Sequence, residues 1–118
     1  MLTYYGYEKC STCKKAKAWL KANHIAFVEK DLMTQTPTKE ELAEWMAASN
    51  LPLRRFFNTS GVLYREMKLK EQIPDLTLEK AAALLASNGK LIRRPLLISN
   101  GKFLVNGFKE DKYEGLLK

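Results

Sequence analysis

The sequence has little of what metal sites, secreted proteins and membrane proteins require. Among its 118 residues are only two cysteines, Cys10 and Cys13, and one histidine, His24. A zinc site takes about four ligands, so these three side chains fall short, and we expect no bound metal. No apolar run approaches the roughly 20 residues that cross a bilayer, and the first residues do not resemble a secretory signal. We therefore expect a cytoplasmic protein without a membrane partner, whose thiols are kept reduced unless they do redox work.

The sequence also has fewer acidic residues than basic ones. Twenty Lys and Arg residues oppose 13 Asp and Glu residues, which gives a net charge of +7. The lysines are dispersed, and the sequence contains no zinc-finger spacing and no aromatic RNA-binding motif. The composition therefore disfavours direct nucleic-acid binding, and a nucleic-acid-binding module is kept only as a third hypothesis.

Hydrophobic residues make up 46% of the chain and charged residues 28%, as in ordinary globular proteins, and the length fits one domain over residues 1–118. A β-prone run at Leu2–Tyr5 precedes the cysteines. Apolar residues at helical spacing after them predict a helix to about residues 23–24. The run Ile25–Val28 predicts a second strand, with Asp31 near its end. A strand, a helix and a strand in this order predict a parallel βαβ unit.

The middle of the chain has the signals of several helices. Thr38 with Glu41 matches a capping box, and Thr77 is a second candidate N-cap. Shorter helices are predicted over residues 51–57 and 67–72, with a turn at residues 58–61 between them. At the end, two β-prone runs joined by Asn100–Gly101 predict a hairpin, and a last helix is predicted over residues 108–117. The element order predicts an α/β sandwich with a helical insertion.

The two cysteines are spaced as Cys-x-x-Cys at the predicted start of a helix. Helix N-termini have unpaired N–H groups and a positive dipole end, both of which favour a thiolate. Such surroundings lower a thiol pKa from about 8.5 to roughly 3.5–7.5. Cys10 is therefore interpreted as the exposed nucleophile, and Cys13, one turn later, as the resolving thiol. The alternative interpretations are two incidental buried cysteines or a metal site.

A second candidate feature is the segment Arg93-Arg94-Pro95 before the hairpin. An arginine near the thiolate would lower the pKa of its sulfur or bind an oxyanion with a bidentate fork. A solvated basic turn is the alternative. Tyr5 and Tyr7 flank the cysteine motif and are interpreted as core residues or as the wall of a substrate groove.

These features together resemble the arsenate reductase (ArsC)/Spx family over essentially the whole chain. The matching segments are Tyr5-Gly6, Lys9-Cys10-Ser11-Thr12-Cys13-Lys14-Lys15-Ala16, Phe57-Asn58-Thr59-Ser60-Gly61 with Tyr64-Arg65, and Leu91-Ile92-Arg93-Arg94-Pro95-Leu96. The resemblance implies a thioredoxin/glutaredoxin-like fold, β-α-β followed by β-β-α, with a central helical insertion. The core would span about residues 1–34 and 90–118, and the insertion about residues 35–89.

The resemblance also implies roles for individual residues. Cys10 matches the cysteine that attacks arsenate, and Pro95 is implied to be a cis-proline that faces the cysteine motif. Arg93 or Arg94 would be the arginine beside the nucleophile, and Arg93 is favoured as the catalytic one. Arg94 and Pro95, together with Ser11 and Thr12 between the cysteines, would have supporting roles.

The sequence departs from the arsenate reductases in its arginines. Those enzymes surround the oxyanion with three arginines, and this chain clearly matches only the one in Arg93-Arg94-Pro95. The other two positions fall near Asn58, a few residues before Arg65, and near Gly107–Phe108. Because each lost charge-assisted hydrogen bond is worth about 1.5–3 kcal/mol, dithiol chemistry is better supported than arsenate as the substrate.

The first hypothesis is therefore a monomeric thiol–disulfide oxidoreductase, with arsenate as one candidate substrate. It needs no bound cofactor, and its electrons would come from thioredoxin, glutaredoxin or a low-molecular-weight thiol. The alternative is an Spx-type redox-switched transcriptional regulator that binds the RNA polymerase α-subunit. That branch has a glycine near the second insertion helix, whereas residues 48–53 here contain none.

Overall fold

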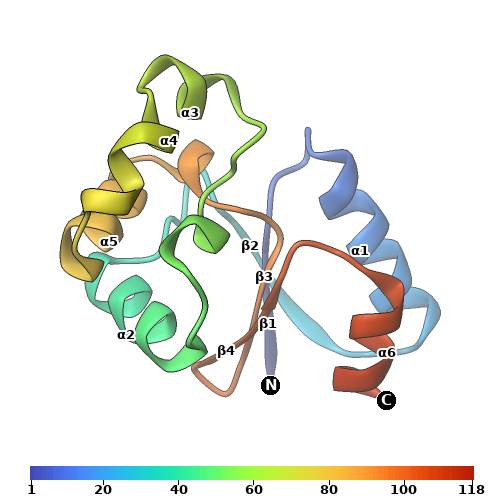
Figure 1. Ribbon diagram of the computed structural model, residues 1–118. Helices are drawn as coiled ribbons and strands as arrows, with labels where there is room; N and C mark the ends of the chain where they lie inside the picture. The colour runs from blue at the N-terminus through green and yellow to red at the C-terminus, as the bar shows by residue number, and fades with distance from the viewer. The chain divides into compact units, whose positions relative to one another are not determined.

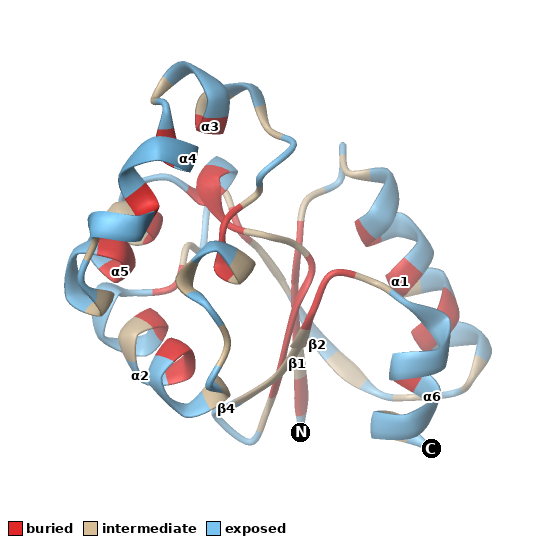
Figure 2. Ribbon diagram, in the orientation of Figure 1, coloured by how far each residue is buried: buried red, intermediate tan, exposed pale blue.

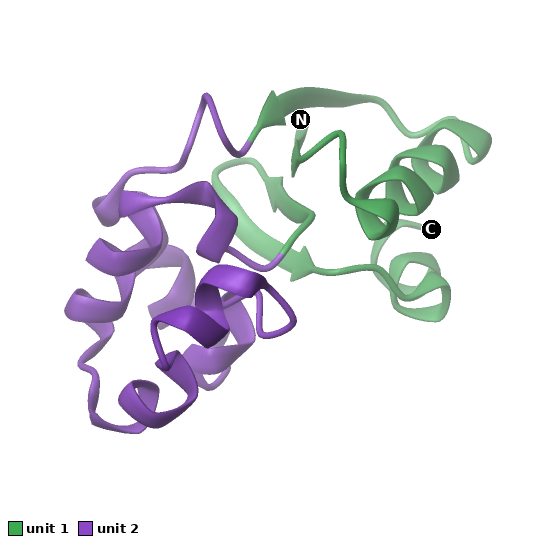
Figure 3. Ribbon diagram, turned by 90° about the horizontal axis from the view of Figure 1, so that it is seen from above, with its two compact units in different colours: residues 1–31, 94–118 green, residues 32–93 purple.

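The computed structural model of the protein describes all 118 residues and divides into two compact units (Figure 3). Unit 1 comprises Met1–Asp31 and Arg94–Lys118, and unit 2 comprises Leu32–Arg93. Compactness does not show that a unit folds alone, so the organisation into one domain with a core and an insertion stays a prediction. None of the helices is long and apolar enough to cross a membrane.

Unit 1 is built on a four-stranded sheet with the strand order β2-β1-β3-β4 (Figure 1). Strand β2 runs parallel to β1, while β3 is antiparallel to both β1 and β4. The strands span Leu2–Gly6 (β1), Phe27–Asp31 (β2), Leu96–Ser99 (β3) and Lys102–Asn106 (β4). The parallel βαβ unit and the thioredoxin-like α/β fold are thereby confirmed.

Two helices pack on one face of this sheet: α1, Ser11–Ala22, and α6, Glu110–Leu117 (Figure 1). The ring centroids of Trp19 and Tyr113 lie 5.5 Å apart in a T-shaped contact that joins the two helices. Such an aromatic pair contributes about 0.5–1.5 kcal/mol beyond the area it buries. Figure 2 shows the buried positions recurring along α1, and the cluster consists of Leu2, Tyr4, Cys13, Ala16, Trp19, Leu20, Leu97 and Tyr113.

The exit from α1 explains why β2 begins later than predicted. His24 has a left-handed backbone, with φ 57°. Its N–H donates to the Lys21 carbonyl at 3.1 Å, and the N–H of Ile25 donates to the Leu20 carbonyl at 3.0 Å. These two bonds form a Schellman motif, which occupies Ile25, so the strand starts at Phe27.

The hairpin predicted from Asn100–Gly101 is confirmed. Both residues have positive φ, 51° and 81°, as a type I′ turn requires. The turn joins β3 to β4.

Unit 2 is helical, and both predicted caps at its longer helices are confirmed. The Thr38–Glu41 capping box starts α2, Lys39–Ser49, and Thr77 caps α5, Leu78–Ser87. These two helices pack against each other. The shorter elements are Leu53–Phe56 (η1), Val62–Glu66 (α3), Leu69–Gln72 (α4), Ile73–Asp75 (η2) and Gly89–Leu91 (η3).

An isolated antiparallel bridge between Phe57 and Ile92 ties two distant segments of unit 2 together. The N–H of Asn58 donates to the Leu91 carbonyl at 2.7 Å, and the N–H of Arg93 donates to the Phe56 carbonyl at 2.9 Å. The bridge fixes the backbone of Arg93 at the last position of unit 2.

Candidate functional site

The cysteine motif forms the N-terminus of α1, as predicted. Cys10 is the N-cap residue, and its sulfur accepts a hydrogen bond from the Cys13 N–H at 3.3 Å. The turn before it is closed by the Cys10 N–H, which donates to the Tyr7 carbonyl at 3.0 Å. The first turn of α1 contains no acidic residue, so the dipole end has no carboxylate near it along the helix.

The two thiols differ in accessibility. Cys10 is half-buried, while Cys13 is 1% exposed and belongs to the packed cluster under the sheet. No disulfide joins them. A reagent from solvent therefore reaches the sulfur of Cys10 first.

The surroundings of Cys10 lower the pKa of its thiol. Burial acts in the opposite direction, but it is outweighed by hydrogen bonds from the Cys13 thiol, from the Cys13 N–H and from the Arg94 side chain, and by the charge of Arg94. Each of these donors stabilises the thiolate, because the anion accepts hydrogen bonds more strongly than the neutral thiol. Surroundings of this kind are those that, in proteins generally, favour the thiolate form of a cysteine.

The pKa of the Cys13 thiol moves the other way, to about 12. Burial is the main cause, and the hydrogen bond that the thiol donates to Cys10 adds to it because that bond exists only in the protonated form. The N–H of Tyr7 donates to the Cys13 sulfur and partly offsets the rise. When Cys10 is ionised, Cys13 therefore remains protonated and acts as a donor to it.

Arg94 is the arginine that the structure brings to the cysteines. Its side chain donates to the Cys10 sulfur, and its guanidinium lies over the Tyr7 ring, with Cζ 5.4 Å from the ring centroid. The peptide bond between Arg94 and Pro95 is cis, as the family resemblance implies. Pro95 is buried, and its carbonyl accepts a hydrogen bond from the Gly107 N–H at 2.9 Å.

Arg93, which the sequence favours as the catalytic arginine, belongs to unit 2. Its Nε is buried without a hydrogen-bond partner, and burial and the charge of Arg55 lower the pKa of its guanidinium. The catalytic role of Arg93 stays a prediction. The side chains of Ser11 and Thr12 are exposed at the helix start, and their supporting roles likewise stay predictions.

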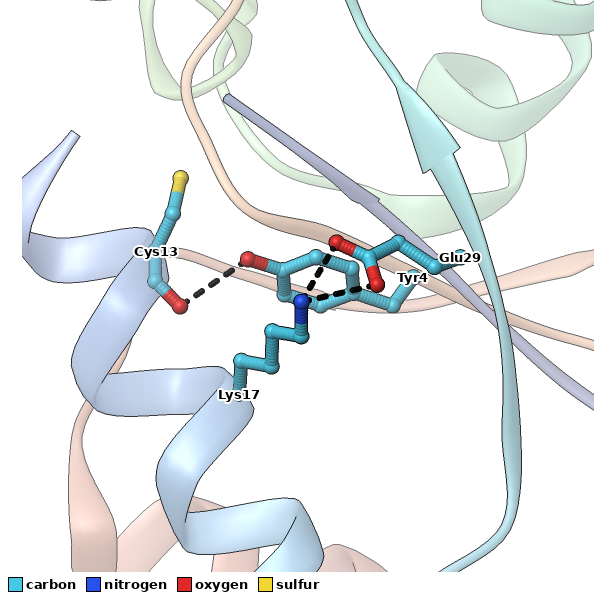
Figure 4. A network of polar contacts seen from close by, with 4 residues as sticks. All are labelled: Tyr4, Cys13, Lys17 and Glu29. Atoms are coloured by element: carbon cyan, nitrogen blue, oxygen red, sulfur yellow. Dashed lines mark hydrogen bonds and ion pairs between the residues drawn. The ribbon is translucent and has the colours of Figure 1, made fainter. Parts of the chain in front are cut away.

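A tyrosine beneath the motif positions Cys13 (Figure 4). The buried hydroxyl of Tyr4 donates to the Cys13 carbonyl at 2.9 Å, and burial raises the pKa of Tyr4, which keeps the hydroxyl protonated as a donor. One turn further, the Lys17 ammonium pairs with the Glu29 carboxylate of β2 at 2.8 Å. These contacts tie α1 to β1 and β2, although the exposed ion pair contributes at most about 1 kcal/mol.

One contributor to the site, Tyr4, was not identified from the sequence, and Tyr7 was interpreted only as a core residue or as the wall of a substrate groove. Tyr4 and Tyr7 fit the ordinary pattern of strand and turn aromatics, which gives no functional signal. Their distances of six and three residues before Cys10 were the only available hint. The candidates Asn58, Thr59, Ser60 and Arg65 lie in unit 2.

Comparisons with known proteins find similar sequences over most of the chain. The sequence profile of the ArsC family matches residues 5–116. The chain is 47% identical over 113 residues to the uncharacterized protein YusI of Bacillus subtilis strain 168, covering 96% of this chain and 95% of YusI. It is 35% identical to the regulatory protein MgsR of the same organism, covering 88% and 81%.

A solved structure is also similar to this chain, both in sequence and in fold. The crystal structure of a possible arsenate reductase from Streptococcus mutans UA159 superposes with a TM-score of 0.94. The two chains are 44% identical, and the match covers 98% of this chain and 97% of the other. The sequence comparison and the structural comparison therefore both match this chain over nearly its whole length.

Proposed function

The chain belongs to the ArsC family, and we propose that it acts within that family as a thiol–disulfide oxidoreductase. The observation that carries the proposal is the asymmetry of the cysteine pair. One sulfur is accessible, with a lowered pKa, and the other is buried, with a pKa of about 12. A nucleophile needs the first set of properties, and a resolving thiol, which reacts only after an adduct forms beside it, tolerates the second.

The reaction consists of two thiol–disulfide exchanges. The Cys10 thiolate attacks one sulfur of a substrate disulfide, forming a mixed disulfide and releasing the other half as a thiolate that takes up a proton. Cys13 then loses its proton and attacks the Cys10 sulfur, which releases the second half as a thiol and leaves a Cys10–Cys13 disulfide. The substrate gains two electrons, and two equivalents of a small thiol, or the dithiol of thioredoxin or glutaredoxin, reduce the protein again in the cytoplasm.

Arg94 is the arginine that we assign to the first step. Its guanidinium donates to the Cys10 sulfur and favours the charged form. Arsenate is the second candidate substrate, attacked by the same sulfur. A disulfide is favoured over it because attack on sulfur develops no multiply charged oxyanion that needs further arginines.

The pair of variants Cys10→Ser and Cys13→Ser tests the proposal. With wild-type protein and a coupled thiol, we expect turnover of insulin disulfides or of a glutathione mixed disulfide. Cys10→Ser should lose turnover by at least about a thousandfold, as removal of a covalent nucleophile does. Cys13→Ser should accumulate one adduct on Cys10, visible by intact mass. Full turnover by Cys10→Ser, or an adduct on Cys13 instead, would contradict the proposal.

A regulator is the second candidate, and the observation that favours it is the 35% identity to the regulatory protein MgsR over 88% of this chain. In that case the disulfide changes a binding surface and no substrate is turned over. Binding of reduced and oxidised protein to the C-terminal domain of the RNA polymerase α-subunit separates the two. Redox-dependent binding without reductase activity would favour the regulator, and turnover without binding would favour the oxidoreductase.

A further inference from the structure

The turn residue Tyr7 contacts three members of the site at once. Its carbonyl accepts the Cys10 N–H at 3.0 Å. Its own N–H acts on the Cys13 thiol, whose pKa it lowers against the effect of burial. Its ring lies beneath the Arg94 guanidinium, at 5.4 Å from centroid to Cζ. The three contacts connect the two cysteines and the arginine through one residue that none of the preceding chemistry uses.

The ring contact reduces the entropic cost of using an arginine side chain as the partner of a thiolate. Arginine has a long side chain with many rotamers, so holding its guanidinium at one acceptor costs conformational entropy. A ring face within about 6 Å attracts the cation and restricts it. A tyrosine at this position therefore reduces the freedom that Arg94 loses when it donates to Cys10.

We propose that Tyr7 is a positioning residue, whose ring holds the Arg94 guanidinium beside Cys10 while its carbonyl holds the backbone of Cys10 at the helix start. The inference deepens the proposed function, because it concerns the same nucleophile and rests on its being the reactive cysteine. Its test uses alkylation of Cys10, which needs no turnover. A failure of the positioning role is thereby distinguishable from a failure of the oxidoreductase proposal.

The experiment is a double-mutant cycle on the full chain, with the Cys10 pKa measured from the pH dependence of the iodoacetamide rate. Replacing Tyr7 by Leu keeps the backbone contacts and removes the ring. We expect Tyr7→Leu to raise the Cys10 pKa by about half a unit, the size of a partly exposed cation–π contact. Tyr7→Phe keeps the ring and should shift the pKa by less than about 0.2 unit.

The Arg94→Gln background separates positioning from a merely structural role. There we expect Tyr7→Leu to leave the Cys10 pKa unchanged, because the cation that the ring holds is gone. A similar shift in both backgrounds would overturn the proposal, since it would mean that the ring acts through the fold and not through Arg94. No shift in either background would overturn it as well.

Two controls complete the design. Lys30 lies over the Tyr5 ring, at 5.6 Å from the centroid, so Lys30→Gln removes the same charge from another cation–π pair. Lys30→Gln should leave the Cys10 pKa unchanged. If Lys30→Gln raised the Cys10 pKa as much as Arg94→Gln does, the specific role of Arg94 would be overturned. The exposed charges next to the motif, Glu8, Lys9, Lys14 and Lys15, are kept in every variant.

A measurement on the wild-type protein covers the case in which Tyr7→Leu does not fold. Protons of the Arg94 side chain that lie over the Tyr7 ring should be shifted upfield in the NMR spectrum by the ring current. Tyr7→Phe should preserve the shift. Random-coil shifts for these protons in the folded wild-type protein would overturn the proposal.

Discussion

Helices α1 and α2 both begin with a side chain that accepts a hydrogen bond from an N–H three residues later. In α1 the acceptor is the Cys10 sulfur, at 3.3 Å from the Cys13 nitrogen. In α2 it is the Thr38 hydroxyl, at 3.1 Å from the Glu41 nitrogen. The first turn of α2 also contains two carboxylates, whereas the first turn of α1 contains none.

The difference shows how one piece of helix physics serves two purposes. At α2 permanent negative charges occupy the positive end of the dipole, and the result is stability. At α1 the only negative group within the N-terminal turn is a sulfur that carries charge only when ionised. The favourable interaction is thus retained for the thiolate, and the helix end lowers the pKa of its cap residue.

The largest effect expected from this comparison is in the reactivity of the two thiols. Cys10 has a lowered pKa and Cys13 a pKa of about 12, so the thiolate fraction at neutral pH differs strongly between them. We expect iodoacetamide to modify Cys10 at least about a hundredfold faster than Cys13 at pH 7. The Cys10 rate should level off at a lower pH than that of an ordinary cysteine thiol, because a lower pKa moves full ionisation to lower pH.

Peptide mapping after timed alkylation measures both rates. Denatured protein is the control, and there the two cysteines should react alike. Equal rates in the folded protein would contradict the assignment of Cys10 as the nucleophile.

Removal of the α2 cap should have the next largest effect, on stability alone. Thr38→Ala leaves the Glu41 N–H without its acceptor and should lower the free energy of unfolding by about 1 kcal/mol. Chemical denaturation measures the loss, and the Cys10 pKa should not change. Thr34→Ala, at an exposed threonine of the same unit, is the matched control. An equal loss in both variants would show that the cap contributes nothing specific.

The smallest expected effect comes from making the first turn of α1 resemble that of α2. Thr12→Glu places a carboxylate beside the thiolate, so the charged form of Cys10 is disfavoured and its pKa should rise by about half a unit. The pH profile of alkylation measures the rise, and Thr12→Gln is the uncharged control. A fall in the pKa, or the same rise in both variants, would contradict the electrostatic explanation.

Local hydrogen-bonding patterns account for what the sequence predicted well. The cysteine helix start, the Thr38 capping box and the Asn100–Gly101 turn each depend on residues within four positions of one another. These three features can therefore be predicted without knowledge of the tertiary structure. The fold class was predicted from these local signals together with the family resemblance.

What sequence reasoning missed depends on conformations without a residue signature. The left-handed residue that ends α1 is His24, where glycine would have signalled the turn. Helix α3 begins after Gly61 with no side-chain cap, so it was not predicted. Arg93 and Arg94 have identical side chains, so the sequence alone did not show that Arg94 donates to the Cys10 sulfur.

The absence of a side chain at Gly6 has a consequence for which mutations the protein tolerates. A Cβ at this position would overlap the Tyr4 ring, whose hydroxyl donates to the Cys13 carbonyl. Even the smallest replacement, alanine, would require the Tyr4 ring to shift away from its present position. A side chain at Gly6 is therefore expected to disturb the hydrogen bond between Tyr4 and the Cys13 carbonyl, so a missing methyl group four residues before Cys10 helps to set where the second sulfur lies.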